Sequence, residues 1–163
     1  MVTQSRPVSG MVKVPDQRLT ANFSLHEMLA SQAAVRNNYT EQFQPPLDVI
    51  ESLRQLCQHV LEPLRMSLNK PVIVTSGYRC PRLNAKIGGS KTSQHMQGEA
   101  ADIYVPGMSA EELFQYIRAR KLPFDQLIQE FDDWVHVSYS SEKKQQVLRA
   151  VKSVKGKTQY LTA

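Results

Sequence analysis

The sequence predicts an α+β fold, in which a small and mainly antiparallel sheet packs against helices. Apolar residues at three- and four-residue spacing indicate an amphipathic helix in the first half of the chain, and short β-branched runs indicate strands in the second half. The length of 163 residues, with 41% hydrophobic and 21% charged residues, suits one domain with a single core. This composition excludes a coiled coil and a largely disordered chain.

The N-terminal segment, residues 1–21, is expected to be an extended arm because it lacks helical or strand periodicity, and residues 22–163 are expected to form the domain. Ser24 and Glu27 have the spacing of a capping box, which predicts a short helix there. The polar residues 32–44 are predicted to be a loop.

A long helix is predicted over residues 45–68. Pro45 and Pro46 suit its first turn, where the N–H that proline lacks would be unpaired in any case. Pro63 lies inside this helix and is expected to kink or split it, because proline cannot donate the backbone hydrogen bond. The helix has one apolar face, formed by Leu47, Ile50, Leu53, Leu56, Cys57, Val60, Leu61, Leu64 and Leu68.

Four strands are predicted from short apolar and β-branched runs. The first two cover residues 71–75 and 100–105, and the stretch between them contains four of the seven glycines, which permit tight turns and close approach to a ligand. The other two cover residues 127–131 and 134–139 and are joined by a turn at Asp132–Asp133.

Two further elements complete the predicted domain. A second capping box at Ser109 and Glu112 predicts a helix that ends near Arg120. Gly156 lies between two runs of β-leaning residues, so residues 146–161 are predicted to form a terminal hairpin. The two cysteines, Cys57 and Cys80, are expected to be buried thiols, because a single pair makes no disulfide framework.

The positive charge of the chain is concentrated at its C-terminus. The last 23 residues account for the whole net charge of +5, since they hold one acid and six basic residues. We call these six the basic tail: Lys143, Lys144, Arg149, Lys152, Lys155 and Lys157. Such a tail suits an anionic polymer as a partner, or serves only as a solvated face. No aromatic residues are interleaved for stacking on bases, so no nucleic-acid partner is expected.

Two of the four histidines lie in places that suit a ligand. His95 precedes a predicted strand, and His136 lies inside an apolar strand, on the face opposite Val135 and Val137 by alternation. Asp102 lies in another apolar strand, seven residues after His95, where a buried carboxylate needs a partner. Two imidazoles and one carboxylate can form a catalytic zinc site with one open position.

The residues around this set carry a family resemblance. Residues 93–102 read S-x-H-x-x-G-x-A-x-D, residues 76–79 read S-G-Y-R, and residues 133–136 read D-W-V-H. In order and spacing they resemble the zinc D-alanyl-D-alanine carboxypeptidases and related peptidoglycan peptidases, whose fold is shared with the hedgehog signalling domain. The resemblance covers residues 22–140.

The resemblance implies zinc ligands at His95, Asp102 and His136. It also implies that Arg79 holds the substrate or the oxyanion, and that Ser93 contacts the substrate backbone or its terminal carboxylate. Both roles given for Arg79 suit its guanidinium group. This group can bind a substrate carboxylate with two hydrogen bonds, and it can stabilise the negative charge that develops on the oxyanion.

Three acidic residues are candidates for the general base. The family places an acid three residues before the last histidine, which favours Asp133. Glu130, on the neighbouring predicted strand, and Asp132, in the turn, are the alternatives. The base needs a carboxylate within hydrogen-bond reach of the attacking water.

The resemblance implies zinc-dependent hydrolysis of peptide bonds in bacterial peptidoglycan, with its peptide stems as substrate and either carboxypeptidase or endopeptidase action. The alternatives are a hedgehog-like domain that keeps zinc without catalysis, and a phage structural protein. If the protein is a peptidoglycan peptidase, we expect the basic tail to bind an anionic wall polymer. The chain is expected to be a monomer.

The chain shows neither a secretory-signal core nor an apolar run of the roughly 18–20 residues that a membrane span needs. It is therefore expected to be a phage lysin released to the wall or a processed periplasmic or secreted enzyme.

Overall fold

The computed structural model describes residues 13–163, so most of the expected N-terminal arm lies outside the described residues. Its helical segments are α1 (Leu25–Leu29), α2 (Gln32–Arg36), the 3-10 helix η1 (Thr40–Phe43), α3 (Leu47–Leu56), the π-helix η2 (Cys57–Leu61), α4 (Glu62–Leu68), α5 (Pro81–Lys86), the 3-10 helix η3 (Gln94–Gln97) and α6 (Ala110–Ala119). Its strands are β1 (Arg18–Thr20), β2 (Phe23–Ser24), β3 (Ile73–Ser76), β4 (Ala100–Tyr104), β5 (Gln126–Glu130), β6 (Trp134–Ser138), β7 (Gln146–Lys152) and β8 (Thr158–Thr162).

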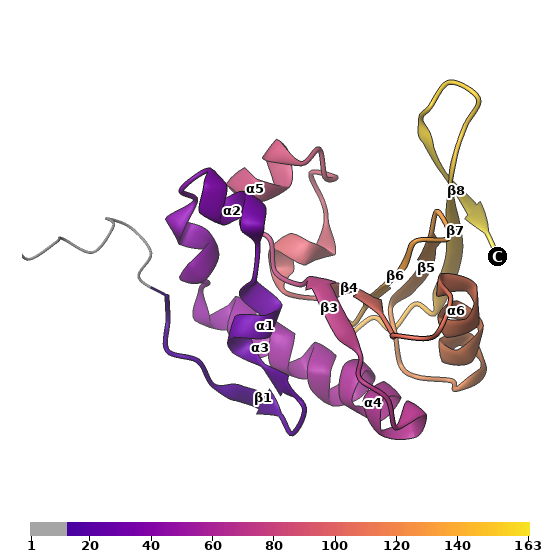
Figure 1. Cartoon of the computed structure of the whole chain (residues 1–163), viewed down its shortest axis with the longest axis horizontal. Helices are drawn as coiled ribbons and strands as arrows, with labels where there is room; N and C mark the ends of the chain where they lie inside the picture. The colour runs from indigo at the N-terminus through magenta and orange to yellow at the C-terminus, as the bar shows by residue number, and fades with distance from the viewer. Residues whose placement is uncertain (1–12) are drawn as a thin grey trace, which may run out of the picture.

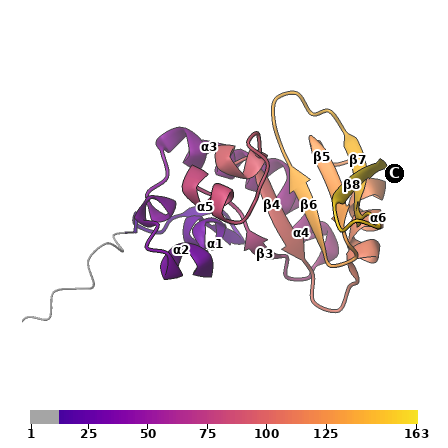
Figure 2. The same ribbon diagram turned by 90° about the horizontal axis from the view of Figure 1, so that it is seen from above.

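The predicted α+β class is confirmed by a six-stranded sheet in the order β3-β4-β6-β5-β7-β8. Its pairs are antiparallel except for β5 and β7, which run parallel. The predicted terminal hairpin is the antiparallel pair β7–β8 at one edge of the sheet. Helices α1, α2, α3 and α5 lie toward one end of the molecule, whereas β7, β8 and α6 lie toward the other (Figures 1 and 2).

The two faces of the sheet differ because side chains alternate along each strand. Val135 and Val137 are fully buried on one face, which belongs to the hydrophobic core. Helix α6 covers that face, since its Glu111 accepts a hydrogen bond from Gln129 of β5. His136 therefore lies on the opposite face, as its alternation with the two valines predicts.

The long predicted helix is present as α3, η2 and α4, which follow one another without a break. The expected interruption at Pro63 takes the form of the π-helical turn over the five residues Cys57–Leu61, which ends two residues before the proline. The π-helical turn is wider than an α-helical turn, so it accommodates the ring of Pro63, which in a regular α-helix would clash with the backbone carbonyl four residues earlier. The two cysteines are free and buried, as expected, and burial raises the pKa of the Cys57 thiol to about 12.

The prediction of a loop over residues 32–44 is wrong for α2 and η1. Ser31 caps α2, because its hydroxyl accepts a hydrogen bond from the backbone N–H of Ala34. The buried Gln42 side chain holds η1 in place through hydrogen bonds to the carbonyl of Tyr78 and from the N–H of Cys80. Tertiary hydrogen bonds thus fold a segment that looks polar in the sequence.

The N-terminal part of the described chain packs on the domain rather than extending from it. β1 pairs with β2, and Leu19 in the middle of β1 is buried. The capping box of Ser24 and Glu27 is confirmed at the start of α1. Within residues 13–163 no helix is both long and apolar enough to cross a membrane.

Candidate active site

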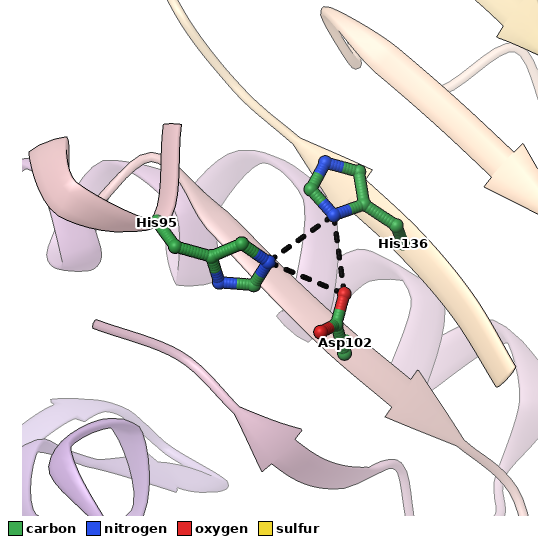
Figure 3. Close-up of side chains that lie close together, drawn as sticks. All are labelled: His95, Asp102 and His136. Atoms are coloured by element: carbon green, nitrogen blue, oxygen red, sulfur yellow. Dashed lines mark hydrogen bonds and ion pairs between the residues drawn. The ribbon is translucent and has the colours of Figure 1, made fainter. Parts of the chain in front are cut away.

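Three predicted ligands, His95, Asp102 and His136, meet on the open face of the sheet (Figure 3). His95 Nε2 lies 3.2 Å from His136 Nδ1 and 3.3 Å from Asp102 Oδ1. His136 Nδ1 lies 3.1 Å from the same carboxylate oxygen. All three residues are buried, with exposed fractions of 1% for His95, 8% for Asp102 and 9% for His136.

The sheet register brings two of these ligands together. Asp102 of β4 and His136 of β6 are direct partners in the antiparallel pair, so their side chains leave the same face side by side. His95 comes from η3, immediately before β4. Ser93 caps η3, since its hydroxyl accepts a hydrogen bond of 3.2 Å from the backbone N–H of His95.

The orientation of His95 follows from the hydrogen bond on its other nitrogen. Its Nδ1 lies 2.7 Å from the carbonyl oxygen of Gly77, which can only accept, so Nδ1 carries the proton. Burial lowers the pKa of His95, although Asp102 opposes that shift, and the ring is therefore neutral. A neutral ring protonated at Nδ1 leaves the Nε2 lone pair aimed at the other two ligands.

Gly77 is required where the chain approaches helix α1. A Cβ on this residue would lie 2.5 Å from the carbonyl oxygen of Met28, closer than side-chain carbons come in folded proteins. The next residue, Tyr78, donates its backbone N–H to that same oxygen at 2.8 Å. The S-G-Y-R segment is thus fixed against α1, and this contact places the carbonyl that orients His95.

Arg79 lies beside the ligands, and three of its nitrogens are already engaged. Its Nη2 is 3.5 Å from Asp102 Oδ2, its Nη1 donates to Asn84 Oδ1, and its Nε donates to Ser76 Oγ. Burial lowers the pKa of Arg79, and the charge of Asp102 partly offsets this effect. The guanidinium stays charged, with N–H groups left over for a bound molecule.

The carboxylate of Asp102 is ionised despite its burial. Burial raises its pKa, but the neighbouring His136 and His95 side chains outweigh that effect and hold the pKa well below its usual range. An ionised carboxylate between two imidazoles is the state that a divalent cation requires.

The three acids considered for the general base lie in different places. Glu130, at the end of β5, is 9% exposed and lines the cavity above the ligands. Burial raises its pKa, while His136 and Arg79 act in the opposite direction. Asp133 lies exposed in the turn and is not among the residues that line the cavity. Asp132 accepts a hydrogen bond from Gln129, whose side chain lies on the α6 side of the sheet.

The cavity over the site has a volume of about 1240 Å³. Beside the predicted residues Arg79 and Ser93, it is lined by residues that the sequence did not single out. Two of them, Leu148 of β7 and Tyr160 of β8, come from the terminal hairpin. No local signal marks them, because they reach the site only through the parallel pairing of β7 with β5.

The geometry of the three ligands fits a metal ion. Zinc–nitrogen and zinc–oxygen bonds of about 2.0–2.2 Å at tetrahedral angles put neighbouring ligand atoms roughly 3.3 Å apart. The observed separations of 3.1, 3.2 and 3.3 Å match that value. Three protein ligands also leave a fourth position on the side of the cavity, as in catalytic rather than structural sites.

Comparison with known families agrees with this geometry. The family model described as peptidase M15 matches residues 21–138, which include every ligand and Arg79. Among curated proteins no match was found. The match covers most of the chain, and it ends before the hairpin β7–β8. A buried set of two histidines and an aspartate, at the spacing of the motif and within the matched segment, shows that this chain belongs to the peptidase M15 family of metallopeptidases.

Proposed function

We propose that the protein is a zinc-dependent peptidase that hydrolyses peptide bonds in bacterial peptidoglycan. The observation that carries this proposal is the convergence of His95, Asp102 and His136 on the floor of an open cavity, with Glu130 and Arg79 on its walls. The peptidase M15 match supports the reaction class. The substrate is proposed from the motif resemblance to peptidoglycan peptidases.

His95 and His136 would hold the metal with one nitrogen each, and Asp102 with a carboxylate oxygen. Two nitrogens and one oxygen with an open fourth position favour zinc among the common biological metals. When bound, zinc lowers the pKa of a water molecule and polarises the carbonyl of the substrate. The hydrogen bond from His95 Nδ1 to Gly77 keeps the correct nitrogen available for this role.

Glu130 is proposed as the general base. It faces the cavity, and its pKa is raised by burial, so its carboxylate binds a proton more readily than that of an exposed glutamate. It would accept a proton from the attacking water and then deliver that proton to the leaving amine. Asp133 has the family spacing but lies outside the cavity lining, which favours Glu130.

Arg79 is proposed to stabilise the negative charge that develops on the scissile carbonyl oxygen. Its fixed position, between Asn84 and Asp102, means that little reorganisation is needed during the reaction. Ser93 also lines the cavity and is proposed to contact the peptide backbone of the substrate.

The basic tail is proposed to bring the enzyme to an anionic wall polymer. In the structure Arg149 is tied to Glu111 and Lys144 to Glu142, whereas Lys155 and Lys157 flank the exposed tip of the β7–β8 hairpin. Exposed cations at a hairpin tip can meet a polyanion without rearrangement of the fold.

The test is a digest of purified peptidoglycan with the zinc-loaded protein, followed by mass spectrometry of the released products. The proposal expects new peptide termini with the protein and, in the same digestion time, about 10²- to 10⁴-fold fewer with the Glu130→Gln variant. Zinc bound at the three ligands without any cleavage would instead favour a catalytically inactive binding domain.

A further inference from the structure

We infer that the enzyme is an endopeptidase, whose substrate chain lies along the cavity on both sides of the scissile bond. This inference rests on the proposed peptidase function and specifies its substrate. The motif does not determine whether the enzyme cleaves an internal peptide bond of the stem or removes the C-terminal residue.

The length of the cavity is the first argument. Its lining follows strand β6 from Trp134 through His136 to Tyr139, just past the end of the strand. At about 3.3 Å per residue this stretch spans roughly 17 Å, enough for about five residues of an extended peptide. A terminal dipeptide would occupy less than half of it. Because His136 lies within the stretch, the cavity continues on both sides of the reacting bond.

The terminal hairpin extends the binding surface at one end. Glu130, Ala150 and Tyr160 are cross-strand partners on β5, β7 and β8, so their side chains share one face in a row. The small Ala150 side chain is fully buried between the two larger ones. Tyr160 is 57% exposed, which leaves its ring free to pack on a substrate chain that passes Glu130.

The charges in the cavity are the second argument. A carboxypeptidase needs a cation for the terminal carboxylate of its substrate. Among the described residues that line the cavity, the Lys and Arg side chains are Arg79, whose free N–H groups the proposed function assigns to the scissile carbonyl oxygen, and Lys144, which is paired with Glu142. Arg79 is bound to Asp102, and Lys144 Nζ lies 2.9 Å from Glu142.

The remaining charged side chains of the lining are acidic. Besides Asp102, the acids are Glu51, Glu99, Asp125, Glu130 and Glu142. Gln94 donates hydrogen bonds to both Glu99 and Asp125, which places these two acids side by side at one end of the cavity, and burial raises the pKa of Glu99. A terminal carboxylate would be repelled there, whereas an uncharged internal segment would not.

The experiment uses a pair of synthetic cell-wall stem peptides that differ only at the C-terminus, one with a free carboxylate and one with an amide. Zinc-loaded protein is incubated with each peptide and with purified peptidoglycan, and mass spectrometry identifies the bond cut. The inference expects an internal cut and rates on the two peptides within about threefold. A carboxypeptidase would release the last residue and would cleave the amide about 10- to 100-fold more slowly, for the loss of a charge-assisted hydrogen bond.

Tyr160→Ala tests the hairpin in the same assay, with Tyr104→Ala as its control, since Tyr104 is an exposed tyrosine of β4 outside the cavity lining. Tyr160→Ala is expected to raise KM on long substrates about 3- to 10-fold while the zinc content stays unchanged. The control is expected to behave as the parent. Release of single C-terminal residues overturns the inference alone. Absence of any cleavage by the parent overturns the proposed function, and the inference with it.

Discussion

Replacing Glu130 by glutamine keeps the size of the side chain and removes its ability to accept a proton. Glu130 lies at the cavity wall, on the face of the sheet that carries His136. Glu130 does not belong to the candidate ligand set of His95, Asp102 and His136, so that set stays complete in the variant. We therefore expect Glu130→Gln to bind zinc as the parent does and to lose most of its activity.

The size of the loss follows from the position of the carboxylate. Removing a general base costs about 10²- to 10⁴-fold in rate. Because Glu130 is 9% exposed and its pKa is raised by burial, we expect the upper part of this range. The glutamine side chain is isosteric and uncharged in a site where burial already disfavours the charge, so stability should change little.

The assay is the initial rate of cleavage of a stem peptide, with zinc content measured on the same samples. Asp133→Asn is the matched control, because it removes one carboxylate from the exposed turn beside Glu130. We expect it to retain parental activity. The assignment is refuted if Asp133→Asn loses activity while Glu130→Gln keeps it, since the family spacing would then identify the base correctly.

Three further changes test the packing at Gly77, the ion pair of Glu111 with Arg149, and the role of the basic tail. Gly77→Ala should lower the free energy of unfolding by about 1–3 kcal/mol, measured in urea, because its Cβ would overlap Met28; unchanged stability would contradict the steric argument. Glu111→Gln should lower stability by about 0.5–1 kcal/mol at pH 7, a modest value because the pair with Arg149 is partly exposed. Arg149 lowers the pKa of Glu111 to about 2, so this contribution is present above the ordinary pKa of 4.5 and is lost as the pH falls toward 2; an equal effect at pH 7 and pH 3 would contradict the assignment. Glutamine at the five lysines of the basic tail should weaken binding to intact cell walls at low salt and leave stem-peptide cleavage unchanged, and parental wall binding across a salt titration would leave the tail as a solvated face.

Much of the candidate metal site could be predicted because its residues carry local signals. Alternation with Val135 and Val137 placed His136 on the open face of its strand, and the burial of Asp102 in an apolar strand called for a partner. The pairing of β4 with β6 then brings the two side chains together. His95 depends on more than its own segment, since Gly77 orients its ring.

The parts that could not be predicted depend on long-range geometry. Phe131 and Asp132 both adopt positive φ, and this tight turn leaves Asp133 exposed while Glu130 faces the cavity. Spacing along the chain does not contain that information. Tyr160 reaches the cavity only because β7 crosses over to pair in parallel with β5. Helix η1 depends on the tertiary hydrogen bonds of the buried Gln42 side chain rather than on periodicity.

The most direct test of the metallopeptidase account is the zinc content of the purified protein after dialysis. The parent should retain about one zinc ion per chain, and His95→Ala, Asp102→Ala and His136→Ala should each lose it. His26→Ala is the control, since His26 hydrogen-bonds the Val14 carbonyl away from the cavity, and it should keep the metal. Full zinc retention by any of the three ligand variants would contradict the assignment of that residue, and a zinc-free parent would contradict the account as a whole.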